Sequence, residues 1–175
     1  MTIVHRQTKS STIAKLIVAF GLFAILPACS DLEMPSLVSL NQVNVSGFKA
    51  GNFNQGLGQD IAEFALAQAP GSTGYCYHYV AKAIHAHLPA FLSGMHAYLA
   101  ADQLAASPYF KEVYVSPESL GSLPAGAVVV WSKGSSESGH ISIADGRGRE
   151  ISDHIDVQMT RHYGGANARV FLPIE

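Results

Sequence analysis

The chain has 175 residues, of which 48% are hydrophobic and 14% are charged, and its formal net charge at pH 7 is −2. This near-neutral balance supplies no basic surface for a phosphate backbone, so nucleic acid is excluded as the expected partner. The length fits one domain, and part of the hydrophobic excess falls in the first thirty residues.

Residues 1–28 have the pattern of an export signal. A basic lead is followed by eleven apolar residues at 16–26, and Leu26-Pro27-Ala28-Cys29 closes the segment with small residues. Eleven residues are fewer than the roughly 20 that a membrane-spanning helix needs, so the run predicts export rather than a permanent span. The ending resembles the lipobox of bacterial lipoproteins, which implies that Cys29 is acylated and becomes the new N-terminus. An ordinary cleaved signal is the alternative.

The segment after the signal is rich in Ser, Asn, Gly and Gln. Residues 29–58 are therefore expected to form the lipidated cysteine and a flexible tether, and residues 59–175 the folded domain. In bacterial lipoproteins Asp after the acylated cysteine is the inner-membrane retention signal. Ser30 stands there in this sequence, so the resemblance implies an outer-membrane anchor facing the periplasm.

Helical patterns occupy the first half of the domain. Apolar residues at helical spacing predict helices over 59–69, from Cys76 to about Leu88, and over 94–106. A proline follows each of the three segments and marks its end.

Strand patterns occupy the second half. Five β-rich runs are predicted, at 110–115, 127–131, 140–144, 150–155 and 168–172. Short turn sequences separate several of them. Helices followed by strands predict an α+β fold, in which N-terminal helices pack on an antiparallel β-sheet of about five strands.

Cys76 is the candidate nucleophile. It begins the second predicted helix, where free N–H groups and the positive end of the helix dipole favour a thiolate over a thiol. With lipid on Cys29, Cys76 has no partner for an intrachain disulfide. His140 opens a later strand, and a cysteine and a histidine far apart in sequence are the parts of a nucleophile–base pair. A small buried side chain without chemistry is the alternative for Cys76.

Three segments, in this order, resemble the papain-like amidohydrolases of bacteria, the CHAP and NlpC-type peptidases. They are Gly-Tyr-Cys-Tyr-His-Tyr-Val at 74–80, Leu-Pro-Ala-Gly-Ala-Val-Val-Val-Trp at 123–131 and Ser-Gly-His-Ile-Ser-Ile-Ala at 138–144. Ala127 departs from the family, whose members commonly have Asp after the turn glycine. The resemblance implies a papain-like fold and the hydrolysis of peptidoglycan peptides without a cofactor.

The resemblance assigns Cys76 as the nucleophile and His140 as the general base. In relatives the group that orients the histidine lies on the following strand. Here Asp153 takes the place of the CHAP glutamate, and His154 that of the second histidine in NlpC-type relatives. Alternation along a strand would put these two side chains on opposite faces, so that only one serves. Asp153 is the preferred assignment and His154 the alternative.

Other residues are assigned to the oxyanion and the substrate. The backbone N–H of Cys76 is expected to hold the oxyanion, with the Tyr75 side chain as a neighbour. Gln68 stands for the upstream glutamine that relatives often add. Trp131 is a candidate substrate contact, although the core or a cleft wall is the more common place for such a residue.

A metal site is not expected. His85 and His87 resemble a metal pair, but residues two apart on a helix point about 200° apart and cannot converge on one ion.

Two classes of function fit these residues. One is a lipid-anchored cysteine hydrolase of cell-wall peptides, either an endopeptidase or an N-acetylmuramoyl-L-alanine amidase, with another amide or an acyl transfer as a variant. The other is a non-catalytic lipoprotein of the same fold that binds wall peptide or a partner protein. A cysteine at a helix start together with a Gly-His strand favours the enzyme. The sequence identifies no regulatory partner.

Overall fold

The computed structural model describes residues 53–134, 136–157 and 166–174. The expected export signal, Cys29 and all but the end of the expected tether lie outside these residues. In the part of the chain that is described, no helix is both long enough and apolar enough to cross a membrane.

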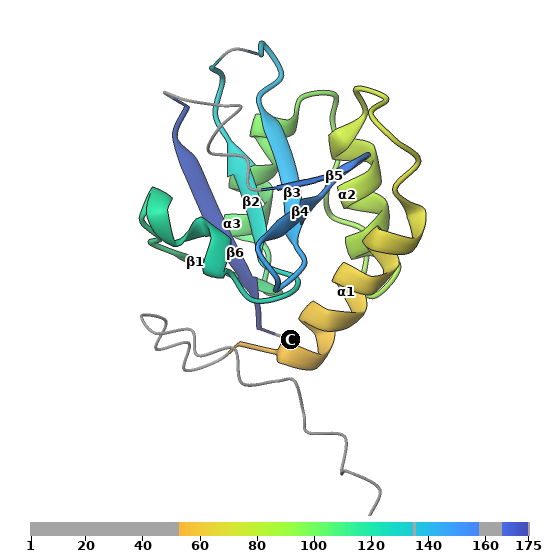
Figure 1. The fold of residues 1–175 in the computed structure, drawn as a ribbon, viewed down its shortest axis with the longest axis vertical. Coiled ribbons are helices and arrows are strands. Elements are labelled where there is room, and N and C mark those ends of the chain that lie inside the picture. The colour runs from red at the N-terminus through yellow and green to blue at the C-terminus, as the bar shows by residue number, and fades with distance from the viewer. Residues whose placement is uncertain (1–52, 135, 158–165, 175) are drawn as a thin grey trace, which may run out of the picture. The chain divides into compact units, whose positions relative to one another are not determined.

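The α-helices precede the strands along the chain, as the sequence predicts (Figure 1). The helices are α1 (Gln55–Gln68), α2 (Cys76–His85), the 3-10 helix η1 (Ala97–Leu99), α3 (Ala100–Ala106) and a second 3-10 helix, η2 (Pro117–Ser122). The strands are β1 (Phe110–Val113), β2 (Val128–Trp131), β3 (His140–Ala144), β4 (Arg149–Ile151), β5 (Ile155–Val157) and β6 (Ala168–Pro173). The α+β prediction is confirmed, with a six-stranded sheet in the described residues where about five strands were expected.

The strands form one antiparallel sheet in the order β1-β6-β2-β3-β4-β5. Successive side chains of β2 point to opposite faces: Val128 and Val130 pack with α1, α2 and α3, whereas Val129 and Trp131 pack with residues around η2. The sheet is therefore buried on both faces at its centre. This explains why β2 and β3 appear in the sequence as nearly continuous apolar runs.

The predicted strand over 150–155 is two strands joined by a turn. β4 ends at Ile151 and β5 begins at Ile155, and the Ser152 N–H donates to the His154 carbonyl across 2.8 Å. The turn breaks the alternation of a continuous strand, and the His154 Nδ1 lies 3.0 Å from the Asp153 Oδ1. The expectation that Asp153 and His154 lie on opposite faces of a strand is therefore wrong, because their side chains contact each other.

The helix α1 begins at Gln55, inside the segment expected to be tether. The Asn54 Oδ1 accepts the Leu57 N–H at 3.0 Å and caps the helix. Gly58, which composition alone assigned to a linker, is a packing contact, since a Cβ there would lie 2.4 Å from the Ala125 carbonyl oxygen. Residues 55–58 thus belong to the domain.

His85 ends α2, three residues before the predicted end, and it holds the loop that follows. Its Nε2 accepts the backbone N–H groups of Phe91 and Leu92, each at 3.1 Å. These two bonds require an unprotonated Nε2. Burial lowers the pKa of His85 below its ordinary value, which favours the same neutral form.

The domain is expected to lose stability in mild acid through His85. Because its pKa is lower in the folded state than in the unfolded state, its contribution is fully present above the unfolded value of about 6.5 and is lost as the pH falls below it. Urea unfolding at pH 7.5 and pH 5.5 measures the loss, and His85→Gln should reduce it. His87→Gln is the matched control, because the His87 ring packs edge-on against Phe64 and should leave the loss unchanged. Equal pH sensitivity in the wild type and His85→Gln would contradict this account.

Candidate active site

Cys76 is the first residue of α2, half-buried and with a free thiol. Backbone N–H groups of Ile141, Tyr77 and Cys76 itself lie near the sulfur and favour its thiolate form. Tyr77 and Cys76 contribute as part of the first helical turn, whose N–H groups have no partner within the helix. Ile141 contributes from β3, so the sulfur lies against the beginning of that strand.

The pKa of the Cys76 thiol is raised above its ordinary value. Burial is the largest cause, and the negative charge of Asp153 adds to it, while the N–H groups of Ile141, Tyr77 and Cys76 act in the opposite direction. The expectation of a resting thiolate at the helix start is therefore wrong in its net direction. A nucleophile in this position needs a base to take its proton.

His140 is the first residue of β3, and only 4% of it is exposed. Gly139 precedes it with a φ of +64°, and a Cβ at Gly139 would lie 2.4 Å from the Trp131 carbonyl oxygen. Only glycine permits this backbone to enter the strand so close to β2. Ile141, whose N–H lies near the Cys76 sulfur, follows directly, so Cys76 and His140 occupy the same end of the sheet.

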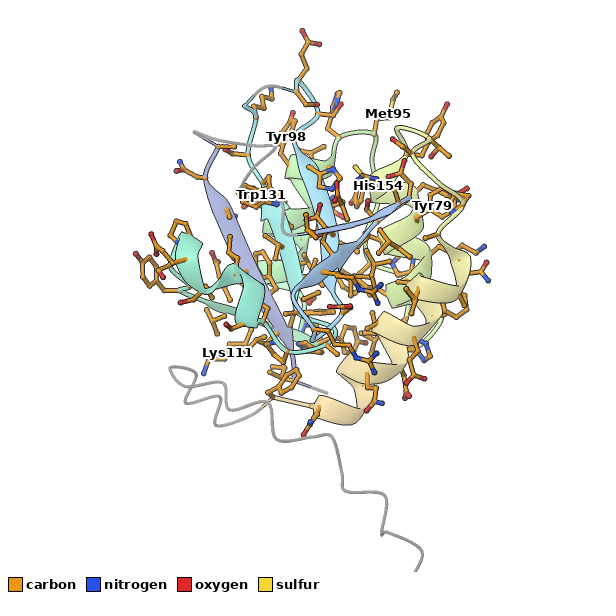
Figure 2. The ribbon with its side chains drawn as sticks, viewed as in Figure 1. Tyr79, Met95, Tyr98, Lys111, Trp131 and His154 are labelled. Atoms are coloured by element: carbon orange, nitrogen blue, oxygen red, sulfur yellow. The ribbon has the colours of Figure 1, made fainter. Side chains whose placement is uncertain are left out.

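His154 lies beside His140. Their ring centroids are 6.1 Å apart, with an angle of 51° between the ring planes. Figure 2 shows His154 at the end of the sheet where α2 begins. Two histidines and a cysteine, from three separate parts of the chain, therefore gather at one end of the sheet.

Asp153 is buried, with 2% exposed, and both of its carboxylate oxygens accept hydrogen bonds. Oδ2 accepts the N–H groups of Thr73 at 2.6 Å, Gly74 at 2.7 Å and Tyr75 at 3.3 Å, and the Thr73 hydroxyl at 2.9 Å. Oδ1 accepts the Ser152 hydroxyl at 3.1 Å and lies 3.0 Å from the His154 Nδ1. The carboxylate thus joins the β4–β5 turn to the loop in front of Cys76.

The pKa of the Asp153 carboxyl lies well below its usual range. Burial alone would raise it, but the hydrogen bonds from His154, Thr73 and Gly74 outweigh that effect. The group is therefore a carboxylate at neutral pH.

Three residues were predicted to contact the oxyanion or the substrate, and the structure places them differently. Tyr75 is 69% exposed and directly precedes Cys76. Gln68 is not at the sulfur, because its Oε1 accepts the Lys82 ammonium at 2.9 Å and Lys82 lies about 9 Å along the axis of α2 from Cys76. Trp131 is 4% exposed in the core cluster around η2, so it cannot serve as a surface for a sugar ring.

Thr73 belongs to the candidate site, although no sequence pattern predicts it. Its contact with Asp153 spans 80 positions, so no local pattern could reveal it. The signal that was available is weaker: Ser-Thr-Gly at 72–74 precedes a helix, where a hydroxyl often takes a backbone N–H.

Among the described residues, no group of three or more His, Cys, Asp or Glu side chains is placed to hold a metal ion. His85 and His87 have separate structural contacts, with the 91–92 backbone and with the Phe64 ring.

Comparisons with family models and with curated proteins find no match to this sequence. Two solved structures have a similar fold. Both are crystal structures of the type VI effector–immunity complex Tae3–Tai3 from Ralstonia pickettii, one of the native complex and one of its selenomethionine form. The chain from the native complex is 24% identical, with a TM-score of 0.53 over 65% of this chain and 96% of that one. The chain from the selenomethionine form is also 24% identical, with a TM-score of 0.52 over 63% of this chain and 97% of that one.

Proposed function

We propose that this chain is a cysteine hydrolase that cleaves amide bonds of peptidoglycan peptides, as an endopeptidase or an N-acetylmuramoyl-L-alanine amidase. The observation that carries the proposal is the position of the Cys76 sulfur at the start of α2, against the strand that His140 opens. The resemblance to CHAP and NlpC-type peptidases supports the substrate class. The fold that the chain shares with a structure from a bacterial effector–immunity complex supports it further.

The chemistry follows from the raised pKa of Cys76. His140 accepts the thiol proton, and the sulfur attacks the carbonyl carbon of the amide. As the tetrahedral intermediate collapses, the C–N bond breaks and His140 returns the proton to the leaving amine. Water, losing a proton to His140, then attacks the thioester. The carboxylic acid leaves, and the thiol is restored.

The oxyanion of the intermediate is held by the backbone N–H of Cys76, which has no partner within the helix because it belongs to the first turn. Tyr75 directly precedes Cys76 and is exposed. Its side chain is therefore placed to contact the substrate chain rather than the reacting atoms.

His154 is the third member of the proposed site, the group that orients the His140 ring. It stands 6.1 Å away between ring centroids, and Asp153 holds its Nδ1. In this proposal Asp153, the preferred third residue from the sequence, acts by orienting His154. A hydrogen bond that fixes one nitrogen of a histidine also fixes its tautomer.

Digestion of purified peptidoglycan by the mature protein tests the function, with mass spectrometry of the soluble products. We expect new amine and carboxyl termini at one type of bond, which identifies the bond directly. The control is the Cys76→Ala protein, which should release no fragments. If the wild-type protein sediments with peptidoglycan and creates no new termini, the proposal is wrong and the chain is a binding lipoprotein.

The lipid anchor belongs to the same proposal, with the protein attached to the outer membrane and facing the periplasm. Cys29→Ser is expected to move the protein from the membrane pellet to the soluble fraction, because acyl chains supply the membrane affinity. Cell fractionation with immunoblotting measures this shift. Cys76→Ser is the matched control and should stay in the pellet. Equal retention of the two variants would indicate another mode of attachment.

A further inference from the structure

We propose that Asp153 is a positioning residue for the nucleophile. Its buried carboxylate clamps the loop Thr73–Tyr75 at the entrance of α2 and holds the His154 ring with its other oxygen. The loop before Cys76 and the His154 ring, which lies beside His140, are thereby held in one geometry. The catalytic meaning of this inference rests on the proposed function, while the clamp itself rests on the hydrogen bonds.

The helix α2 has no side-chain cap of its own. Tyr75 occupies the N-cap position and makes no capping bond through its side chain. Most helices that begin in a loop use a local Ser, Thr, Asp or Asn for this purpose. Asp153, 77 positions after Cys76, does not replace such a cap but holds the loop in front of the helix, where it accepts three consecutive N–H groups on one oxygen. A charged acceptor makes such bonds shorter and stronger than a neutral one.

Further bonds close the clamp around the loop. The Thr73 hydroxyl donates to Asp153 at 2.9 Å and accepts the Tyr75 N–H at 3.3 Å. The Gly71 N–H donates to the backbone carbonyl of Asp153 at 2.9 Å. The loop over 71–75 is therefore held by both the main chain and the side chain of one residue, which leaves little freedom to the residue that follows, Cys76.

The charge of the clamp also affects the chemistry of the sulfur. The negative charge of Asp153 raises the pKa of the Cys76 thiol, because a nearby anion disfavours the thiolate. Asp153 therefore acts on the nucleophile in two opposite ways: it fixes the position of the sulfur and makes the thiolate harder to form. The two effects can be separated by experiment.

Asp153→Asn removes the charge and keeps one acceptor oxygen, whereas Thr73→Val removes the hydroxyl bonds and keeps the charge. The first measurement is the rate of Cys76 alkylation by iodoacetamide against pH, with His140, His154 and Asp153 as the titratable groups around the sulfur. The second is hydrogen exchange of the amides over 71–76. The third is kcat and KM on a defined stem peptide.

For Asp153→Asn we expect the alkylation midpoint to move to lower pH by up to about 1 unit. Loop exchange should rise about tenfold or more. A displaced nucleophile should lower kcat by about 10²-fold with little change in KM. Thr73→Val should loosen the loop and lower kcat in the same direction, with the alkylation midpoint unchanged because the carboxylate remains.

Asp145→Asn is the matched control. Asp145 also caps a loop through a side chain that is nearly buried, accepting the N–H groups of Arg147 at 2.7 Å and Arg149 at 2.9 Å. It lies at the far end of β3 from His140. This variant should lose stability yet leave Cys76 alkylation, exchange over 71–76 and kcat unchanged.

The clamp is overturned if Asp153→Asn retains wild-type loop exchange and kcat, or if Asp145→Asn alters them equally. Should Asp153→Asn fail to fold, Thr73→Val decides alone, and wild-type exchange over 71–76 in that variant overturns the clamp. Alkylation and exchange need no substrate. A protein that cleaves no peptidoglycan but shows both changes would therefore refute the proposed function and retain the clamp.

Discussion

Replacing Cys76 by alanine is expected to lower the turnover of peptidoglycan by about 10⁴-fold or more, because no other group can form the covalent intermediate. Folding should be nearly unaffected. The side chain is small and half-buried at a helix start, so the free energy of unfolding should change by about 1 kcal/mol or less. Release of peptides measured by mass spectrometry gives the turnover, and urea unfolding gives the stability.

Cys76→Ser is the companion to this variant, since it keeps the shape of the side chain and exchanges the thiol for a poorer nucleophile. It should be as inactive as Cys76→Ala. If the Cys76→Ala protein cuts peptidoglycan at the wild-type rate, the proposed cysteine mechanism is wrong.

Replacing His140 by glutamine should reduce turnover by a factor similar to that for Cys76→Ala. The raised pKa of Cys76 keeps the resting sulfur protonated, so without a base few molecules carry a thiolate at neutral pH. Glutamine keeps much of the volume of this buried side chain and limits the loss of packing. Turnover of the single variants and of the double variant with Cys76→Ala is the measurement.

The double variant distinguishes a catalytic unit from two independent effects. Residues that act together are not additive, so Cys76→Ala combined with His140→Gln should be no slower than Cys76→Ala alone. A double variant that loses the product of the two single factors would place His140 outside the chemistry of the sulfur.

His154 and Asp153 are connected in a way that changes how their variants should be interpreted. Each contacts the other, and Asp153 also holds the nucleophile loop. Loss of activity in either variant therefore does not by itself identify the direct partner of His140. The alkylation profile of Cys76 separates them, since of these two residues only Asp153 is a carboxylate whose charge raises the pKa of the thiol.

The sequence by itself determined the class of the fold and the two ends of the candidate dyad. Helical spacing after Cys76 and the apolar run after His140 are local patterns, and turn residues such as Gly139 act within a few positions. Patterns of this kind depend only on residues close together in the sequence, so they can be read without the structure. For that reason α2 and β3 begin where the sequence predicts them, and β2 begins one residue later.

Tertiary structure alone decided what surrounds the sulfur. The pKa of Cys76 is raised because burial, together with the charge of the distant Asp153, outweighs the backbone N–H groups near the sulfur. Asp153 reaches the loop at Thr73 because the β4–β5 turn folds back against the start of α2 (Figure 1). Contacts between distant segments depend on how the helices pack against the sheet, so no periodic pattern in the sequence predicts them.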